Sequence, residues 1–300
     1  MFKKSLIIFI STAAIFTSCS TKINSETNDI ADLEVSLDSN EITLKLSGNT
    51  EEDVIFYNLL YPIDMIAVID KKDSYYNSNL INPLNNISNY TQSHQMALAL
   101  GVYGADLSYL WIFNQSQQSL SYFVGIKQLA SDLGISGDFM TMSAVKAEKY
   151  TDNIDTLVNI ARKTFYHCDN YLNKNNQPDL AVLILLGGWI ESMHAAVELY
   201  KTPNNKMACK IISQKYSLAS LLNLLNRQEN NETVLKYTPI LIDILNEFDR
   251  LQNEFLSDNL KIDTATKSIT FALTTNILMQ PVELKELRRM IGGIRAEIIR

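Results

Sequence analysis

Two polar residues on an otherwise apolar helical segment are the first candidates for chemistry. Tyr103 and Asp106 are three residues apart, so on a helix they share a face, and that face adjoins Leu107 and Leu110. A carboxylate beside an apolar stripe must find hydrogen-bond donors or shift its pKa. The pair therefore predicts either a structural hydrogen-bond hub or a ligand-binding or catalytic site.

A second apolar segment contains Trp189, Glu191 and His194. Glu191 and His194 form a Glu-x-x-His motif, and di-metal carboxylate bundles use two such motifs together with two further glutamates. The other two histidines have no acid three residues before them. Glu191 and His194 are therefore only a weak metal candidate, and we predict no metal and no cofactor.

One pocket that combines the two segments is the sharpest hypothesis for a site. Asp106 and Glu191 would be its acids, with Tyr103 and Trp189 shaping it. Paired-carboxylate hydrolysis needs the two groups about 5–9.5 Å apart. The chain has no nucleophile elbow, P-loop or zinc-protease motif, and its 3 histidines are a thin supply for general acid–base catalysis. We expect a non-enzymatic binding module. A carboxylate enzyme, a metal-binding bundle and a purely structural component stay as alternatives.

Helical periodicity supplies the elements that must position these residues. Apolar residues recur at spacings of three and four, and prolines and glycines are few. The pattern predicts a mainly α fold, either a multi-helix bundle or a helical-hairpin array such as a tetratricopeptide-like one. The predicted helices span 94–114, 119–133, 144–173, 178–200, 204–226 and 238–256, and a last helix opens at Pro281.

Two of these helices have unusual composition. The helix at 178–200 is apolar nearly all round, which is typical of a helix in the centre of a domain. It contains Gly187-Gly188, and the helix at 94–114 contains Gly101 and Gly104. Glycine inside a helix costs about 1 kcal/mol relative to alanine. Close approach of two helices is the simplest compensation, and backbone exposed to a ligand is the alternative.

Alternating apolar and polar residues predict β structure near the two ends of the chain. Leu33–Leu37 and Ile42–Leu46 alternate on either side of Asp38-Ser39-Asn40, which indicates a small N-terminal β-hairpin. Residues 268–275 alternate in part and are a candidate for one further strand. We expect residues 33–300 to form a single mostly helical domain.

The N-terminus has the pattern of a bacterial lipoprotein signal. Lys3 and Lys4 precede an apolar run of about 11 residues, which is too short to span a bilayer. The run ends in Phe16-Thr17-Ser18-Cys19, which resembles the lipobox, although Phe16 departs from the usual aliphatic residue. We predict a signal peptide at 1–18, lipidation of Cys19 and a flexible tether at 19–32. We expect the protein to lie on the outer membrane, facing the periplasm.

Charge and cysteine content restrict the partners. Loss of Lys3 and Lys4 with the signal peptide leaves 24 basic against 33 acidic residues, a net charge of −9, and such a domain repels nucleic acid. Its partners are then the membrane, through lipid, and an unidentified protein or small molecule. Cys168 and Cys209 remain after Cys19. They are either two buried thiols or a disulfide, which the periplasm permits.

Three segments together resemble a known group of proteins. They are Leu80-Ile81-Asn82-Pro83, the Gly-Val-Tyr-Gly-Ala-Asp-Leu run at 101–107, and Gly187-Gly188-Trp189-Ile190-Glu191. Their order and spacing are similar to those of uncharacterised Bacteroidota lipoproteins. The resemblance implies the helical fold, the phylum and an envelope location, and it implies no reaction, because no activity is established for that family.

Overall fold

A computed structural model describes most of the 300-residue chain. The described residues are 32–38, 41–47, 75–135, most of 143–150, 153–228, 230–255, 261–263, 268–272 and 279–300. The predicted signal peptide, Cys19 and the tether up to residue 31 lie outside them. By its internal contacts, Ala31–Arg300 is one compact unit.

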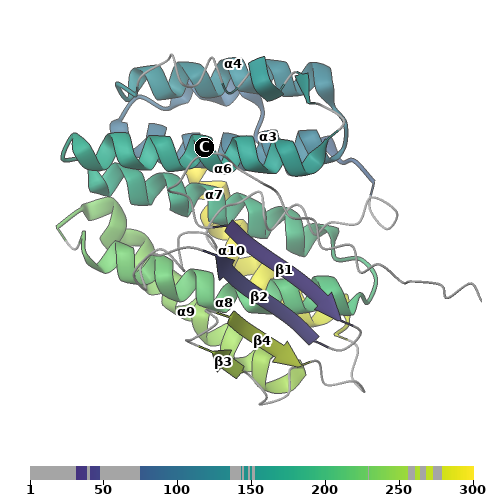
Figure 1. Ribbon diagram of the computed structural model, residues 1–300. Helices are drawn as coiled ribbons and strands as arrows, with labels where there is room; N and C mark the ends of the chain where they lie inside the picture. Colours follow the sequence, from purple (N-terminus) through teal and green to yellow (C-terminus); the bar gives the residue numbers. More distant parts are fainter. Residues whose placement is uncertain are drawn as a thin grey trace, which may run out of the picture. The chain divides into compact units, whose positions relative to one another are not determined.

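The described part of the chain is mainly α-helical, as the sequence predicts (Figure 1). Three short 3-10 helices, η1 (Ser78–Leu80), η2 (Leu84–Asn89) and η3 (Pro281–Leu284), accompany the α-helices. The α-helices are α3 (Ser93–Ile112), α4 (Ser116–Asp132), α6 (Ile154–Lys174), α7 (Pro178–Leu199), α8 (Asn205–Asn226), α9 (Glu232–Phe255) and α10 (Lys285–Ile298).

Helix α7 is the centre of the helical packing. It contacts α3, α6, α8 and α10, and 17 of its residues are buried. By length and composition α7 alone among the described helices is apolar enough to cross a membrane, and 94% of its most apolar stretch is buried inside the protein. Its all-round apolar surface is therefore accounted for by neighbouring helices, which confirms the predicted central position.

Two glycines bring α3 and α7 into backbone contact. A Cβ atom on Gly101 of α3 would lie 2.0 Å from the carbonyl oxygen of Ile184 in α7. A Cβ atom on Gly187 of α7 would lie 2.0 Å from the carbonyl oxygen of Leu98 in α3. Only glycine permits this separation, so close helix approach is the compensation for the propensity cost. Gly104 differs, because its missing side chain makes room for the ring of Phe165 in α6.

Helix α9 begins before the proline that was expected to open it. The predicted start at Thr238-Pro239 is wrong, and the helix begins at Glu232 with Pro239 in its interior. The side chain of Asn231 accepts hydrogen bonds from the backbone N–H groups of Thr233 and Val234 and caps this earlier start. Pro239 is exposed. Water can therefore satisfy the carbonyl left without a helical partner, while apolar burial continues on the other face.

The predicted helix at 144–173 is interrupted near its start. The chain turns at Tyr150, whose backbone N–H donates to Ala147, and α6 begins at Ile154. The Asn153 side chain accepts a hydrogen bond from the Thr156 N–H. An N-cap asparagine satisfies a free N–H donor of the first turn and so favours a helix start at this point. The apolar periodicity alone did not reveal this start.

Four strands form one antiparallel sheet in the order β1-β2-β4-β3 (Figure 1). They are β1 (Asp32–Asp38), β2 (Glu41–Ser47), β3 (Lys261–Asp263) and β4 (Ser268–Ala272). The register places Val35 opposite Leu44, and Leu44 opposite Ile269. Strand β4 falls within the predicted strand at 268–275. Residues 39–40, where the hairpin turn is predicted, lie outside the described residues.

The contribution of the α3–α7 contact to the stability of the protein can be tested by substituting Gly101. Gly101→Ala places a methyl group against the Ile184 carbonyl, so one helix must shift. We expect a loss of about 2–3 kcal/mol in the free energy of unfolding, at the upper end of overpacking effects. Urea denaturation followed by circular dichroism measures it.

The matched control is Gly293→Ala in α10. Gly293 is exposed, and a Cβ atom there meets nothing within 4 Å. Alanine has the higher helix propensity, so the unfolding free energy should stay unchanged or rise by up to about 1 kcal/mol. Similar losses in the two variants would show that the close contact is not the cause.

Candidate functional site

The two candidate acids lie together in the interior. Asp106 on α3 and Glu191 on α7 are each 1% exposed, and their carboxyl groups hydrogen-bond to one another. Arg295 on α10 binds both oxygens of Glu191, with Nε donating to Oε2 at 2.6 Å and Nη2 donating to Oε1 at 2.7 Å. This fork geometry is the strongest form of a charge-assisted hydrogen bond. We call Asp106, Glu191 and Arg295 the buried triad.

A segment without α-helix lies across the triad and is bonded to it through backbone atoms. We call this segment, Leu80–Tyr90, the strap. Arg295 Nη2 donates to the Leu80 carbonyl at 3.0 Å, and the Asn82 N–H donates to Asp106 Oδ2 at 3.0 Å. Two tyrosine hydroxyls complete the set, Tyr122 donating to the Asn82 carbonyl at 2.7 Å and Tyr103 donating to the Pro83 carbonyl at 2.9 Å.

The triad holds one positive charge opposite two carboxyl groups, which determines its protonation. Burial raises the pKa of Asp106 well above 3.8, and the neighbouring Glu191 charge raises it further. Burial also raises the pKa of Glu191, but Arg295 and the hydrogen bond from Asp106 act in the opposite direction. The proton therefore resides on Asp106, which donates to the ionised Glu191, and the triad is neutral as a whole.

The tyrosines around the triad remain protonated. Burial is the main reason that the pKa values of Tyr90, Tyr103 and Tyr122 are raised. Tyr103 is fully buried, and its ring packs edge-on against both Tyr90 and Tyr122. Each hydroxyl takes part in a hydrogen bond with the strap or within it, since Tyr90 accepts from the Asn82 amide at 2.9 Å. The geometry is that of a satisfied hydrogen-bond hub.

The fourth predicted pocket residue lies elsewhere. Trp189 is 2% exposed, and its ring packs against Phe248 of α9 at a centroid distance of 6.4 Å. It is two residues from Glu191 on α7, so the two side chains leave the helix in different directions. The structure thus unites Asp106, Glu191 and the neighbouring Tyr103, and it places Trp189 in the packing between α7 and α9.

The Glu-x-x-His motif has a different role from metal binding. Arg295 occupies both oxygens of Glu191. Burial, followed by the charges of Arg295 and Arg288, lowers the pKa of His194 to about 3, so its ring is neutral at ordinary pH. Among the described residues no group of three or more histidines, cysteines or acids is arranged to hold a metal ion.

Sequence reasoning missed Arg295, Asn82, Tyr90 and Tyr122 as site residues. A signal for Arg295 was present, because Ile291, Ile294, Arg295 and Ile298 have the three- and four-residue spacing of the buried stripe of α10. A charged residue on such a stripe requires a buried partner of opposite charge. No local pattern, however, indicated that this partner is Glu191, 104 residues earlier in the chain.

An open groove of about 470 Å³ lies at the ends of α3 and α10, two of the helices that form the triad. Three helix ends line it, namely the start of α3, the start of α9 and the end of α10, and Tyr90 of the strap joins them. Buried Tyr90, Leu98, Tyr237 and Ile298 form its inner part. The polar lining consists of Gln92, His94, Gln95, Glu232, Thr233, Lys236, Glu297 and Arg300. The sequence hypotheses did not include this groove.

The two remaining cysteines are separate thiols. Cys168 on α6 and Cys209 on α8 are both free and buried. Burial raises the pKa of each thiol to about 12. Because the thiolate is the reactive form, neither side chain is suited to nucleophilic chemistry.

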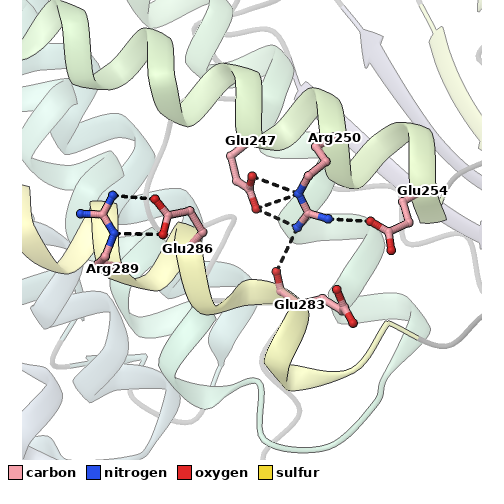
Figure 2. A network of polar contacts seen from close by, with 6 residues as sticks. All are labelled: Glu247, Arg250, Glu254, Glu283, Glu286 and Arg289. Carbon is pink, nitrogen blue, oxygen red and sulfur yellow. Dashed lines mark hydrogen bonds and ion pairs between the residues drawn. The ribbon is translucent and has the colours of Figure 1, made fainter.

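Further charged contacts lie on α9, η3 and α10 (Figure 2). Arg250 of α9 binds Glu247 and Glu254, and it also donates to the Glu283 carbonyl of η3 at 3.3 Å. Arg289 pairs with Glu286 one turn earlier on α10. These pairs are exposed, so water and salt screen them, and they contribute little beyond joining α9 to η3.

No family model, curated protein or solved structure matches this chain.

We expect substitution of Arg295 to lower the free energy of unfolding far more than substitution of Arg289 on the same helix. Arg295→Met leaves Glu191 ionised in the interior without its partner, or forces it to take up a proton. We expect a loss of about 3–5 kcal/mol in the free energy of unfolding, which is typical of a broken buried ion pair. Chemical denaturation at pH 7 measures the loss.

Arg289→Met is the matched control. Arg289 is exposed and pairs only with exposed Glu286 in the contacts shown in Figure 2. Its removal should leave the denaturation midpoint close to that of the wild type. If the two arginine variants unfold at the same denaturant concentration, the buried triad is not a main contributor to stability.

Proposed function

We propose that the protein is a non-enzymatic lipoprotein of the bacterial envelope that binds a small polar ligand in the groove between the ends of α3, α9 and α10. The N-terminal signal and Cys19 support attachment to the outer membrane, facing the periplasm. The groove is the observation that carries the binding function. Its volume of about 470 Å³ lies within the range of about 300–1,000 Å³ typical of small-molecule sites.

The charges of the groove favour a neutral or zwitterionic ligand. Lys236 and Arg300 supply two positive charges, and Glu232 and Glu297 supply two negative charges. Lys236 and Glu297 form an ion pair with one another across the groove lining. The inner tyrosine rings and the glutamine amides at the start of α3 suit polar groups carried on an apolar frame, such as sugars, amino acids and short peptides.

The carboxylate-enzyme alternative has less support. Asp106 and Glu191 do lie together, but they touch each other, whereas hydrolysis by paired carboxylates needs about 5–9.5 Å between them. Each is 1% exposed, and Arg295 occupies both oxygens of Glu191. A substrate and a water molecule have no access to these acids in this arrangement.

We also propose an N-terminal β-hairpin and a helical bundle as the finer features of the fold. Paired strands at Asp32–Asp38 and Glu41–Ser47 support an N-terminal hairpin. A bundle is favoured over a tetratricopeptide-like array, because α3 packs against α7, which follows it by several helices, whereas repeat units contact only their neighbours. The three segments that resemble Bacteroidota lipoproteins supply Asn82, Asp106 and Glu191 to one network.

The anchor is tested by changing Cys19. In a Gram-negative host, Cys19→Ser removes the residue that would receive lipid. Because each buried methylene of a lipid chain contributes about 0.8 kcal/mol to membrane binding, we expect the variant to leave the membrane fraction and to incorporate no radiolabelled palmitate. Cys168→Ser is the control, and it should stay in the membrane fraction with its label. Retention and labelling of Cys19→Ser would reject the lipoprotein assignment.

The groove is tested by thermal shift of the full chain in detergent with a panel of sugars, amino acids and dipeptides. A ligand at about 100 times its Kd adds about 2.7 kcal/mol to the stability, which raises the melting temperature by several degrees. Glu232→Gln and Arg300→Ala alter exposed groove residues and should remove the shift. Lys127→Ala on the outer side of α4 is the control and should retain it. A flat panel, or a shift that survives both groove variants, would reject the site.

A further inference from the structure

The strap is attached to the helices in an unusual way. Four side chains from α3, α4 and α10 hold it, namely Asp106, Tyr103, Tyr122 and Arg295, and each of them bonds to a backbone atom of the strap. Its own regular structure is limited to 3-10 turns. Leu80, Ile81 and Tyr90 are buried in the hydrophobic core, whereas Leu84 and Ile87, which lie over Gly125 of α4, are only partly buried. Polar bonds to the helices and the burial of these three side chains together keep the strap in place.

Two of these bonds come from the triad, whose charge depends on one proton. With the proton on Asp106, one carboxylate and one guanidinium balance each other. Without it, two adjacent carboxylates share a single guanidinium in an apolar interior, with one negative charge in excess. Admitting water relieves that cost, and the strap is the segment without α-helix that is bonded to the triad through its backbone.

We propose that the strap is a proton-operated latch, closed over the triad while Asp106 is protonated and released when Asp106 loses its proton, and that its release dismantles the groove. The second half of this proposal deepens the proposed function as regulation of the same site. The first half, release of the strap on loss of the Asp106 proton, concerns the protein alone and can be tested without any ligand.

The strap connects to the groove at two points. Tyr90 at the end of the strap is part of the groove lining. The Asn86 amide donates to the Ile299 carbonyl at 3.0 Å, next to the lining residue Arg300. The same amide donates to Asn82 at 2.7 Å, whose backbone N–H binds Asp106. Movement of the strap would therefore remove Tyr90 from the groove lining and break the bond to Ile299, next to Arg300.

The charged and titratable groups around Asp106 are the following. Glu191 on α7 and Arg295 on α10 bind or face it directly. Tyr76, Tyr90, Tyr103, Tyr109 and Tyr122 surround it, and their pKa values are raised, so they stay neutral. His194 faces Arg295 and is neutral because its pKa is lowered. Asp106 is thus the group of this set whose raised pKa favours a protonated, neutral side chain in the closed state.

The sign of the pH dependence follows from the direction of the shift. The pKa of Asp106 is 3.8 in an open, solvated state and lies well above that value when the strap is closed. Opening therefore releases a proton, so the closed state is favoured most strongly below pH 3.8 and loses its advantage as the pH rises through the folded pKa. Over that window the opening equilibrium constant increases about tenfold per pH unit.

Hydrogen exchange measures this opening. The amides of residues 80–90 are followed by mass spectrometry in the full chain between pH 5 and pH 9, and rates are corrected for intrinsic exchange. We expect their protection to be lower than that of α7 and to fall by up to about tenfold per pH unit. Asp106→Asn keeps the shape and donates to Glu191 at every pH, so the strap's protection should become independent of pH.

Two further variants keep the test decisive. Asp169→Asn changes an α6 acid whose pKa burial raises to about 6, and it should leave the pH dependence of the strap intact. Tyr122→Phe removes the bond to the Asn82 carbonyl and should lower the strap's protection equally at all pH values. If Asp106→Asn does not fold, Tyr122→Phe still tests the proposal. The strap's protection in that variant should have the same pH dependence as in the wild type and a lower value at each pH.

Two results would overturn the latch. One is the same pH slope of strap protection in the wild type and in Asp106→Asn. The other is strap protection equal to that of α7 at every pH, which means that the strap opens only when the whole domain unfolds. Either result leaves the groove as a binding site untouched, because no ligand is present in the measurement.

Discussion

The bidentate bond between Arg295 and Glu191 determines much of the arrangement around it. It joins α10 to α7 across 104 residues of chain, and it leaves Asp106 to hold the remaining proton. A buried guanidinium requires acceptors for its other donors, and the Leu80 carbonyl supplies one. The position of the strap follows, since Leu80 is fixed by Arg295 and Asn82 by Asp106. The remaining tyrosine bonds add to this attachment.

Backbone contact of α3 with α7 makes this convergence possible. Gly101 and Gly187 remove the side chains that would otherwise separate the two helices. Asp106 lies little more than one turn beyond Gly101, and Glu191 lies one turn beyond Gly187. The glycine contact thus brings the two carboxyl groups within hydrogen-bonding distance. The same closeness leaves no room for a substrate between them, which is why we propose a ligand site at the helix ends and not at these acids.

Several elements were predictable from local pattern. Helices α3, α4, α7 and α8 occupy their predicted segments, because apolar spacing and Pro178 carry enough local information. The start of α9 was predicted wrongly, because burial of its apolar face outweighs the local preference of Pro239 for a first turn. Asp106 and Glu191 were singled out in the sequence as acids on apolar helices, and both are buried. Trp189 was grouped with them because it is two residues from Glu191. On a helix, however, residues two apart point in different directions.

The sequence by itself determined the helical class, the central position of α7, the glycine contact and the acids that needed partners. These properties depend on spacing within one helix, which a single segment encodes. Only the tertiary structure decided that Arg295 is the partner, that the proton lies on Asp106, and that the ends of three helices enclose a groove. Such features depend on distances between segments far apart in the chain, and on the desolvation that folding imposes.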